Sequence, residues 1–266
     1  MPTYLYAIIG IFFIFFCTCL GSSFVFFFRK KNINEKVNQI FLGFAAGIML
    51  SASIFSLILP SIDMEIDYMP SWLIAAISVF LGAFFMWGID KLVPHFHSEQ
   101  NKEEGLPSKV SKTGKMFLAV TIHNVPEGLS VGIAFGVALA NIGSGDSNTG
   151  VITALMLAIG IGIQNIPEGA VVSLPIRGES GSTRKAFLFG SLSGAVEPIA
   201  AILGLFLAYF IEPIMPWALS FAAGCMLYVI AEEMIPDAKG DPTSHGGVWA
   251  FILGFILMMC LDISLG

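Results

Sequence analysis

Residues 115–140 read KMFLAVTIHNVPEGLSVGIAFGVALA, which is apolar except for one short polar motif. A helix needs about 20 apolar residues to cross the hydrocarbon core of a bilayer, so this stretch predicts a transmembrane helix. The motif, HNVPEG at 123–128, puts a histidine and a glutamate at the depth of the lipid chains. A similar motif, QNIPEG at 164–169, lies within the next apolar run. The sequence therefore predicts a membrane protein with polar groups in its middle.

The composition of the whole chain agrees with this prediction. Of its 266 residues, 56% are hydrophobic and only 12% are charged, whereas soluble globular proteins carry about a quarter charged residues. Eight long apolar runs are separated by mostly short polar connections, of which the longest is a predicted cytoplasmic loop at 91–114. We expect one all-α membrane domain over residues 1–266 and no folded soluble domain. The predicted spans, numbered in chain order, are 4–28, 38–60, 71–90, 115–140, 151–174, 186–210, 216–235 and 247–264.

The basic residues predict the orientation of these spans. With the N-terminus outside, the loops after spans 1, 3, 5 and 7 face the cytoplasm, and all 13 basic residues lie in or beside those loops. Cytoplasmic loops carry an excess of Lys and Arg, so we expect both ends of the chain outside. We interpret span 1 as an anchor rather than a cleaved signal peptide, because RKK follows it at 29–31. The basic residues are Arg29, Lys30, Lys31, Lys36, Lys91, Lys102, Lys109, Lys112, Lys115, Arg177, Arg184, Lys185 and Lys239.

Charge and cysteine content argue against two other classes of protein. The net charge of −6 gives no support for nucleic acid binding. The four cysteines lie in apolar runs, with spacings typical of buried free thiols rather than of a disulfide framework or a Cys-rich zinc site. These cysteines are Cys17, Cys19, Cys225 and Cys260.

Three glutamates lie well inside predicted spans 4, 5 and 6, with no Lys or Arg at the same depth. His123 and Glu127 are four residues apart, so they share one face of span 4. Span 5 carries Glu168 and span 6 carries Glu197. Ionisable groups at membrane depth are costly and usually functional. Either these carboxyls are protonated, or a cation from solution balances them. We favour a divalent metal such as Zn²⁺, because oxygen donors and one imidazole are suitable ligands for it.

A proline lies next to each of these glutamates and supports a site rather than simple helix packing. Pro126, Pro167 and Pro198 cannot donate a backbone hydrogen bond, so each frees a carbonyl one turn earlier. Free carbonyls at membrane depth are tolerated only beside protein or a cavity. A single polar residue often serves as packing glue between helices, but that reading does not account for the whole group. Paired N-P-A motifs of water channels are a weaker match, since those proteins lack a carboxylate cluster.

At these residues the chain resembles the ZIP (Zrt/Irt-like) metal transporters, and in particular the bacterial GufA-like branch. HNVPEG and QNIPEG resemble the paired signatures of spans 4 and 5 of that family. Supporting stretches are FLGFAAGIMLSASIFSLILPSID at 41–63, DKLVPHFH at 90–97, VEPIA at 196–200 and AEEMIP at 231–236. The resemblance implies uptake of divalent metal into the cytoplasm across the cell membrane, by an elevator-like motion of spans 1, 4, 5 and 6 past spans 2, 3, 7 and 8. It also implies a homodimer.

The resemblance further implies a two-metal centre at mid-membrane. Its transport site would take Zn²⁺, with Cd²⁺, Fe²⁺ and Mn²⁺ as further candidates and no organic cofactor. An adjoining site would use two asparagines and share glutamates with the first. Some relatives have Asp where this chain has Asn165, which predicts a second site here that is weaker or differently selective. The implied ligands are Met49, His123, Asn124, Glu127, Gln164, Asn165, Glu168 and Glu197.

A path to and from this centre is also expected. An acidic outer mouth at Asp63 would concentrate cations, and the resemblance implies an inner path through Asp90, His95, His97 and Glu233. Two other functions remain open, a membrane metalloenzyme and a metal sensor. The protease signature H-E-x-x-H is absent, as are the paired Glu-x-x-His motifs of di-iron bundles, so we do not expect an enzyme.

Overall fold

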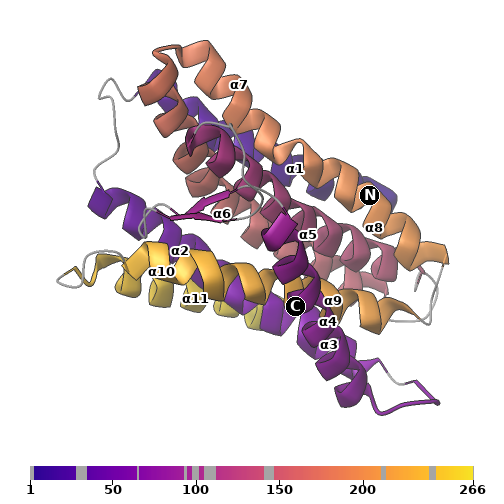
Figure 1. Ribbon diagram of the computed structural model, residues 1–266. Coiled ribbons are helices and arrows are strands. Elements are labelled where there is room, and N and C mark those ends of the chain that lie inside the picture. Colours follow the sequence, from indigo (N-terminus) through magenta and orange to yellow (C-terminus); the bar gives the residue numbers. More distant parts are fainter. Residues whose placement is uncertain are drawn as a thin grey trace.

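The computed structural model describes residues 3–27, 35–64, 66–92, 95–97, 102–104, 112–140, 147–210, 214–239 and 244–265. Eight of its helical stretches are long and apolar enough to cross a membrane, which confirms the predicted all-α membrane fold (Figure 1). They are Tyr4–Phe26, Gln39–Asp63, Ser71–Leu92, Val120–Ala140, Gly150–Gly178, Thr183–Ala208, Met215–Lys239 and Gly246–Ser264.

Four spans are single α-helices and two are helices interrupted by a π-helical turn. The single helices are α4 (Ser71–Leu92), α5 (Lys112–Ala140), α6 (Ser147–Ser180) and α11 (Gly246–Leu265). Span 2 consists of α2 (Glu35–Ala52), η2 (Ser53–Ile58) and α3 (Leu59–Asp63), and span 7 consists of α9 (Met215–Val229), η4 (Ile230–Met234) and α10 (Ile235–Lys239). Span 1 ends α1 (Thr3–Ser22) with a short 3₁₀ turn, η1 (Ser23–Phe26).

Proline explains both π-helical turns. Pro60 and Pro236 each follow the turn by one or two residues and have no N–H to donate to the carbonyl four residues earlier. The chain accommodates this with wider hydrogen bonds, from Leu59 N–H to the Ile54 carbonyl and from Ile235 N–H to the Ile230 carbonyl. Such turns are frequent at functional sites, and η4 carries Glu233.

Proline also breaks span 6. Helix α7 (Thr183–Gly194) is capped by Ala195, and α8 (Val196–Phe210) continues the span. Pro198 cannot donate to the Gly194 carbonyl, and the chain closes with a tighter bond from Ala195 N–H to the Leu192 carbonyl. In contrast, α5 and α6 remain continuous through Pro126 and Pro167. The break puts Glu197 in the first turn of α8.

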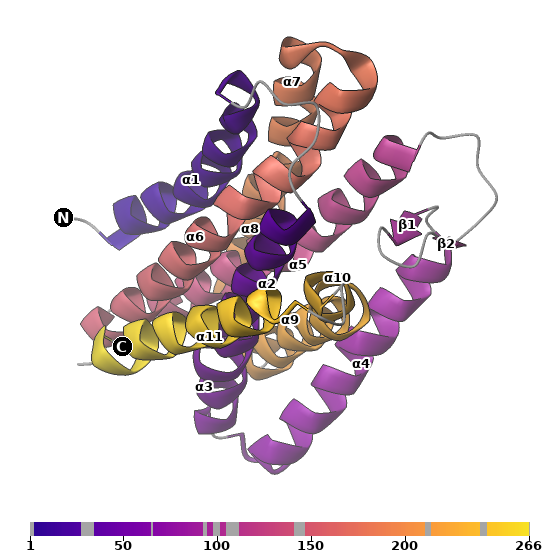
Figure 2. The ribbon, with the colours of Figure 1, turned by 90° about the vertical axis from the view of Figure 1, so that its left-hand side faces the viewer.

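The helices pack in two groups. Helix α5 packs most extensively on α8, and α1 on α6; α11 packs on α2, and α4 on α9. One group therefore comprises spans 1, 4, 5 and 6, and the other comprises spans 2, 3, 7 and 8. Figure 2 shows α1, α6 and α8 on one side of α2 and α11, with α4 on the other side. The groups meet mainly where α6 contacts α2 and where α5 contacts α9.

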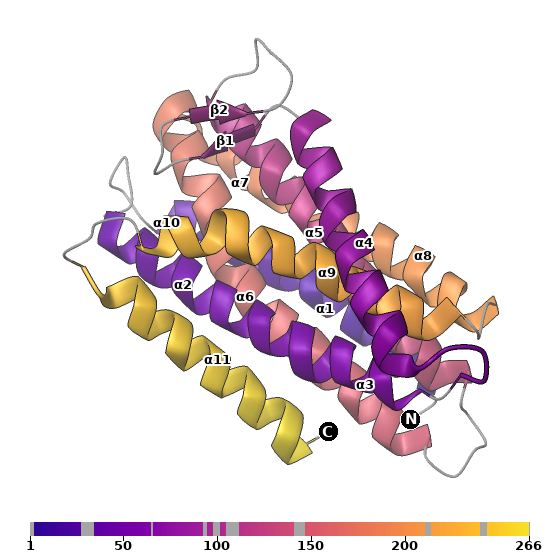
Figure 3. The same cartoon turned by 60° about the horizontal axis from the view of Figure 1, so that its bottom comes forward.

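The connection between α4 and α5 contains a feature that the sequence did not indicate. Strands β1 (His95–His97) and β2 (Lys102–Glu104) form a short antiparallel pair, with His95 opposite Glu104, within the loop expected at 91–114. Figure 3 shows this pair at one end of the bundle, while α1 begins and α11 ends toward the opposite end, near α3. The even number of spans requires this arrangement; that the strand pair faces the cytoplasm remains a prediction from the basic residues.

Candidate metal centre

The two motif segments face each other because α5 and α6 pack side by side near their middles. Glu127 and Gln164 are fully buried, and Glu168 is 8% exposed. Glu127 lies close enough to both Glu168 and Glu197 to interact with them electrostatically. Like charges placed together in a poorly polarisable medium repel one another strongly. The three carboxylates of spans 4, 5 and 6 therefore lie near one another inside the helix bundle; that they form a metal centre remains a prediction.

Several side-chain oxygens in this cluster have nothing to bind within the part of the chain that the structure describes. Buried oxygens normally have a hydrogen-bond partner, and an exception calls for an explanation such as an ion. The buried oxygens without one include both of Glu127 and one of Glu168, together with Gln164 Oε1, Asn124 Oδ1 and Asn165 Oδ1. All of them belong to the two motifs, and oxygens of this kind are metal ligands.

Glu197 differs from the other two glutamates because both of its oxygens are occupied. Thr18 donates its hydroxyl to Oε1 at 2.8 Å, and Asn124 Nδ2 donates to the same atom at 3.1 Å. Asn165 Nδ2 donates to Oε2 at 2.9 Å. Hydrogen bonds to a carboxylate are about twice as strong as those between neutral groups. Three donors from three other spans thus compensate for the loss of water around this buried acid.

Each asparagine Nδ2 carries two hydrogens, and the acceptor of the second hydrogen fixes the orientation of the amide. Asn124 Nδ2 also donates to the Ser193 carbonyl at 3.0 Å, and Asn165 Nδ2 donates to the Ile14 carbonyl at 3.3 Å. Every one of these partners is an acceptor, so a flipped amide would place oxygen against oxygen. Each Oδ1 must therefore point away from Glu197.

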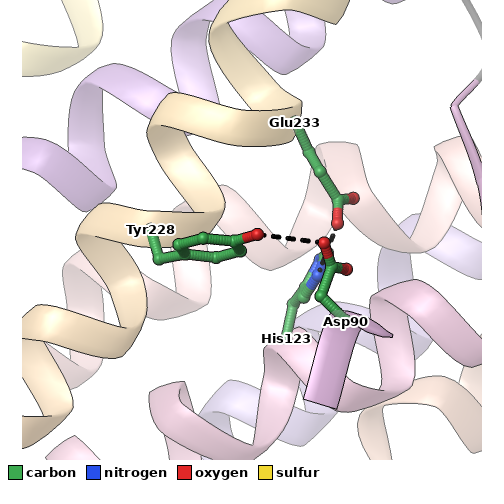
Figure 4. Close-up of polar contacts among 4 residues, drawn as sticks. All are labelled: Asp90, His123, Tyr228 and Glu233. Atoms are coloured by element: carbon green, nitrogen blue, oxygen red, sulfur yellow. Dashed lines mark hydrogen bonds and ion pairs between the residues drawn. The ribbon is translucent and has the colours of Figure 1, made fainter. Parts of the chain in front are cut away.

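His123 lies at the boundary between the two helix groups. Its Nε2 is 3.0 Å from Glu233 Oε1 on η4, and it is also close enough to Glu168 for an electrostatic interaction. Nearby, Tyr228 donates its hydroxyl to Asp90 Oδ2 at 3.0 Å (Figure 4). His123 thus links the carboxylate cluster to a second polar group, formed with Asp90, Tyr228 and Glu233, toward the end of the bundle that carries β1 and β2.

This arrangement does not enclose a metal ion. Among the described residues, no three His, Cys, Asp or Glu side chains converge as they would around one ion. Two contacts explain why: His123 is turned toward Glu233, and Glu197 is held by its three donors. Glu127 and Glu168 remain bare and close together.

The other predicted site residues lie in the core and toward the two ends of the helix bundle. Met49 is 1% exposed in the core of α2, as expected for either a ligand or a packing residue. Asp63 ends α3 and is exposed, as an outer mouth requires. Asp90 and Glu233 lie together near His123. His95 and His97 lie on β1, which packs against α5; their side chains are outside the described part of the structure.

Two residues of these networks were missed from the sequence. Thr18 lies in the apolar segment FFCTCLGS and bonds to an acid 179 residues away. Tyr228 could not be identified from the sequence either, because its hydrogen-bond partner Asp90 is on another helix. A buried hydroxyl in a span is usually read as helix packing, so only the fold identifies these partners.

Comparison with known proteins gives one consistent result. A family model described as "ZIP Zinc transporter" matches residues 4–116 and 113–262. The protein named "Zinc transporter ZIP11" from Homo sapiens is 34% identical, over 98% of this chain and 97% of its own length. "Zinc transporter GufA" from Myxococcus xanthus is 34% identical over 89% of this chain and 90% of its own length, and "Zinc transporter ZIPB" from Bordetella bronchiseptica is 32% identical over 98% and 82%.

Proposed function

Because this chain belongs to the ZIP zinc transporter family, with GufA among its relatives, we propose that it moves Zn²⁺ into the cytoplasm through a centre at mid-membrane. It is a multi-pass membrane transporter, not an enzyme. Glu127 and Glu168 bind the ion, Gln164 adds a neutral oxygen, and His123 completes the site when it leaves Glu233. Met49 is a further proposed ligand from span 2.

The observation that carries this proposal is the set of unpartnered motif oxygens. Burying such an oxygen without a hydrogen bond costs about 1–3 kcal/mol, and more if it is charged. A passing cation would relieve that cost at several oxygens at once. A polar side chain that only holds helices together would, in contrast, have its oxygens hydrogen-bonded in this structure, as Glu197 has.

The division into two helix groups supports an elevator-type motion. All three cluster carboxylates lie in the group of spans 1, 4, 5 and 6, whereas Glu233 and Asp90 lie in the other group. Sliding of the first group would carry the ion past fixed residues of the second, which is how broken-helix transporters alternate access. Asp63 would then serve the outer side, and Glu233 and Asp90 the inner side, with His95 and His97 beyond them.

Further details of the function are proposals of the same kind. Cd²⁺, Fe²⁺ and Mn²⁺ are candidate alternative ions, because oxygen-rich sites discriminate weakly among divalent metals. We also propose the cell membrane as location and a homodimer as assembly. The second ion position implied by the resemblance depends on the charge at residue 165.

The direct test is metal flux into sealed liposomes that contain the purified protein and a trapped zinc indicator. A transporter raises the internal Zn²⁺ signal with time in proportion to protein, while empty liposomes do not. A metal sensor would bind zinc without flux, and a metalloenzyme would show neither saturable flux nor counterflow. Binding without flux would therefore contradict the proposal.

Removal of the inner contact of His123 provides a prediction about release. Glu233→Gln keeps the size of the side chain but loses the charge that holds His123. Release of the ion toward the inner side should slow, because this acid no longer competes for the histidine or the metal. We expect reduced flux with zinc affinity changed by less than about 10-fold, measured by flux and by equilibrium dialysis. Loss of binding and flux together would instead make Glu233 part of the mid-membrane site.

Protons should compete with the metal. Zinc binds ionised glutamates and a neutral imidazole, so each ligand must be free of the proton that occupies the same lone pair. The apparent zinc affinity should therefore fall as the pH falls from neutral toward about 5, and zinc binding should release protons. Calorimetry in buffers of different ionisation enthalpy measures both effects. An affinity independent of pH, with no proton release, would contradict this ligand set.

A further inference from the structure

The three buried glutamates have two different environments. Glu127 has two unpartnered oxygens and Glu168 has one among the described residues, whereas both oxygens of Glu197 accept hydrogen bonds. A metal at Glu197 would have to displace donors that are already in place. At Glu127 the metal would meet only the neighbouring Gln164 side chain, and at Glu168 it would meet an oxygen that has no hydrogen-bond partner among the described residues. Glu127 and Glu168 therefore have oxygens that can bind a metal ion, whereas the oxygens of Glu197 already accept hydrogen bonds from other helices.

The donors to Glu197 connect every helix of one group. Thr18 belongs to α1, Asn124 to α5 and Asn165 to α6, and Glu197 itself lies in the first turn of α8. The first turn of a helix also favours a negative charge, because of the helix dipole, and Glu197 lies in the first turn of α8. One carboxylate thus links span 1 to the consecutive spans 4, 5 and 6.

Glycines bring these four backbones close together at the same level. A Cβ on Gly128 would lie 2.7 Å from Glu197 Cα, and one on Gly194 would lie 2.7 Å from Thr18 Cβ. A Cβ on Gly169 would lie 2.9 Å from Ser22 N and would overlap the Thr18 carbonyl oxygen. Small residues permit such close helix contacts in membranes. The final glycine of each motif therefore packs at the Glu197 network, independently of any metal.

From these observations we propose that Glu197 is a structural tie and not a metal ligand, with Thr18 and Asn165 as its positioning residues, so that the centre carries a single divalent ion. This inference rests on the proposed function, because it concerns the same centre. Asn165 plays the decisive part: its Nδ2 satisfies one oxygen of Glu197, and the only other polar atom of its side chain is a neutral Oδ1 that has no hydrogen-bond partner among the described residues. The four spans then move as one body whether or not the ion is present.

A count of charges agrees with one ion. With one Zn²⁺, the charges of Glu127 and Glu168 are balanced, and the remaining negative charge is on Glu197, where three donors already stabilise it. With two Zn²⁺, three carboxylates leave one net positive charge at membrane depth, which is costly without a counter-ion. An aspartate at position 165 would supply the fourth carboxylate that two ions need.

The test is the number of zinc ions bound at the centre of the purified protein in detergent, measured by equilibrium dialysis and elemental analysis. Zinc bound elsewhere, for example by loop histidines, is subtracted with the double variant Glu127→Gln, Glu168→Gln. We expect a difference of one ion per protomer for the natural sequence and of two for Asn165→Asp. Two ions in the natural sequence would overturn the inference, as would one ion in Asn165→Asp. No difference at all would instead mean that the proposed centre itself is wrong.

Variants of the tie provide a second test. Glu197→Gln should still bind one ion, with an affinity within about 10-fold of the natural sequence, whereas loss of a ligand should cost about 100-fold or more. Thr18→Val, which removes only a hydroxyl donor, should lower the thermal unfolding midpoint of the metal-free protein, and Thr18→Ser should restore it. A loss of affinity well beyond the roughly 10–100-fold expected for a residue that only orients a ligand would show that Glu197 is itself a ligand. An unchanged midpoint in Thr18→Val would show that the tie carries no stability.

Discussion

Glu127→Ala and Glu168→Ala should each remove most zinc uptake while the protein still reaches the membrane. Each change deletes one of the two bare carboxylates in the centre, leaving a divalent ion with a net positive charge at membrane depth. Loss of residues that merely orient a metal ligand costs about 10–100-fold, and we expect at least the upper end of that range for a ligand itself. Folding should survive, because removing a repelled carboxylate relieves repulsion with its neighbour.

The measurement is initial zinc uptake at matched protein amounts, with membrane insertion checked separately. Glu232→Ala is the matched control: it removes an acid from η4 whose side chain is exposed, and it should transport nearly normally. Near-normal uptake by either centre variant would contradict the proposed ligand set. An equal loss of zinc uptake in Glu232→Ala would indicate that the acidic residues act only through the overall electrostatic potential of the protein.

The eight spans and the burial of the motif acids could be predicted because each depends on local sequence. An apolar run of sufficient length has few alternatives to a transmembrane helix, and an acid inside such a run must face protein. The prediction from proline was limited to a freed carbonyl one turn before Pro126, Pro167 and Pro198; it did not extend to the form of the backbone there, or to Pro60 and Pro236. Pro60 and Pro236 gave π-helical turns, Pro198 split span 6, and Pro126 left α5 continuous.

The partners of the polar groups could not be predicted, because they depend on how distant helices pack. The spacing of His123 and Glu127 placed both on one face of a helix, yet His123 binds Glu233 on another span. Similarly, Glu197 seemed equivalent to the two motif glutamates until the fold placed Thr18 beside it. Composition and periodicity describe one helix at a time, whereas the function of a buried acid depends on its neighbours from the others.

Gly132→Ala, which adds one methyl group, should disturb folding more than any of the variants above. Its Cβ would lie 2.7 Å from Ala201 Cα on α8 and would overlap the carbonyl oxygen of that residue. The obstacle is backbone, so no side-chain rotation can relieve it, and α5 must move away from α8. Overpacking of a well-packed core costs about 1–3 kcal/mol and occasionally more. Because α8 also carries Glu197, this movement should disrupt the tie and the centre together.

Gly88→Ala is the control that separates the steric clash at Gly132 from the general effect of replacing a helical glycine by alanine. Gly88 lies within α4, and a Cβ there would meet no atom within 4 Å in the described structure. Alanine is favoured over glycine in a helix by about 0.8–1.0 kcal/mol, so Gly88→Ala should be neutral or slightly stabilising. Gly132→Ala should instead give a lower yield of folded protein, a lower thermal midpoint in detergent and little zinc flux. Equal behaviour of the two variants would mean that α5 and α8 are not in backbone contact, and the four-helix group described above would have to be abandoned.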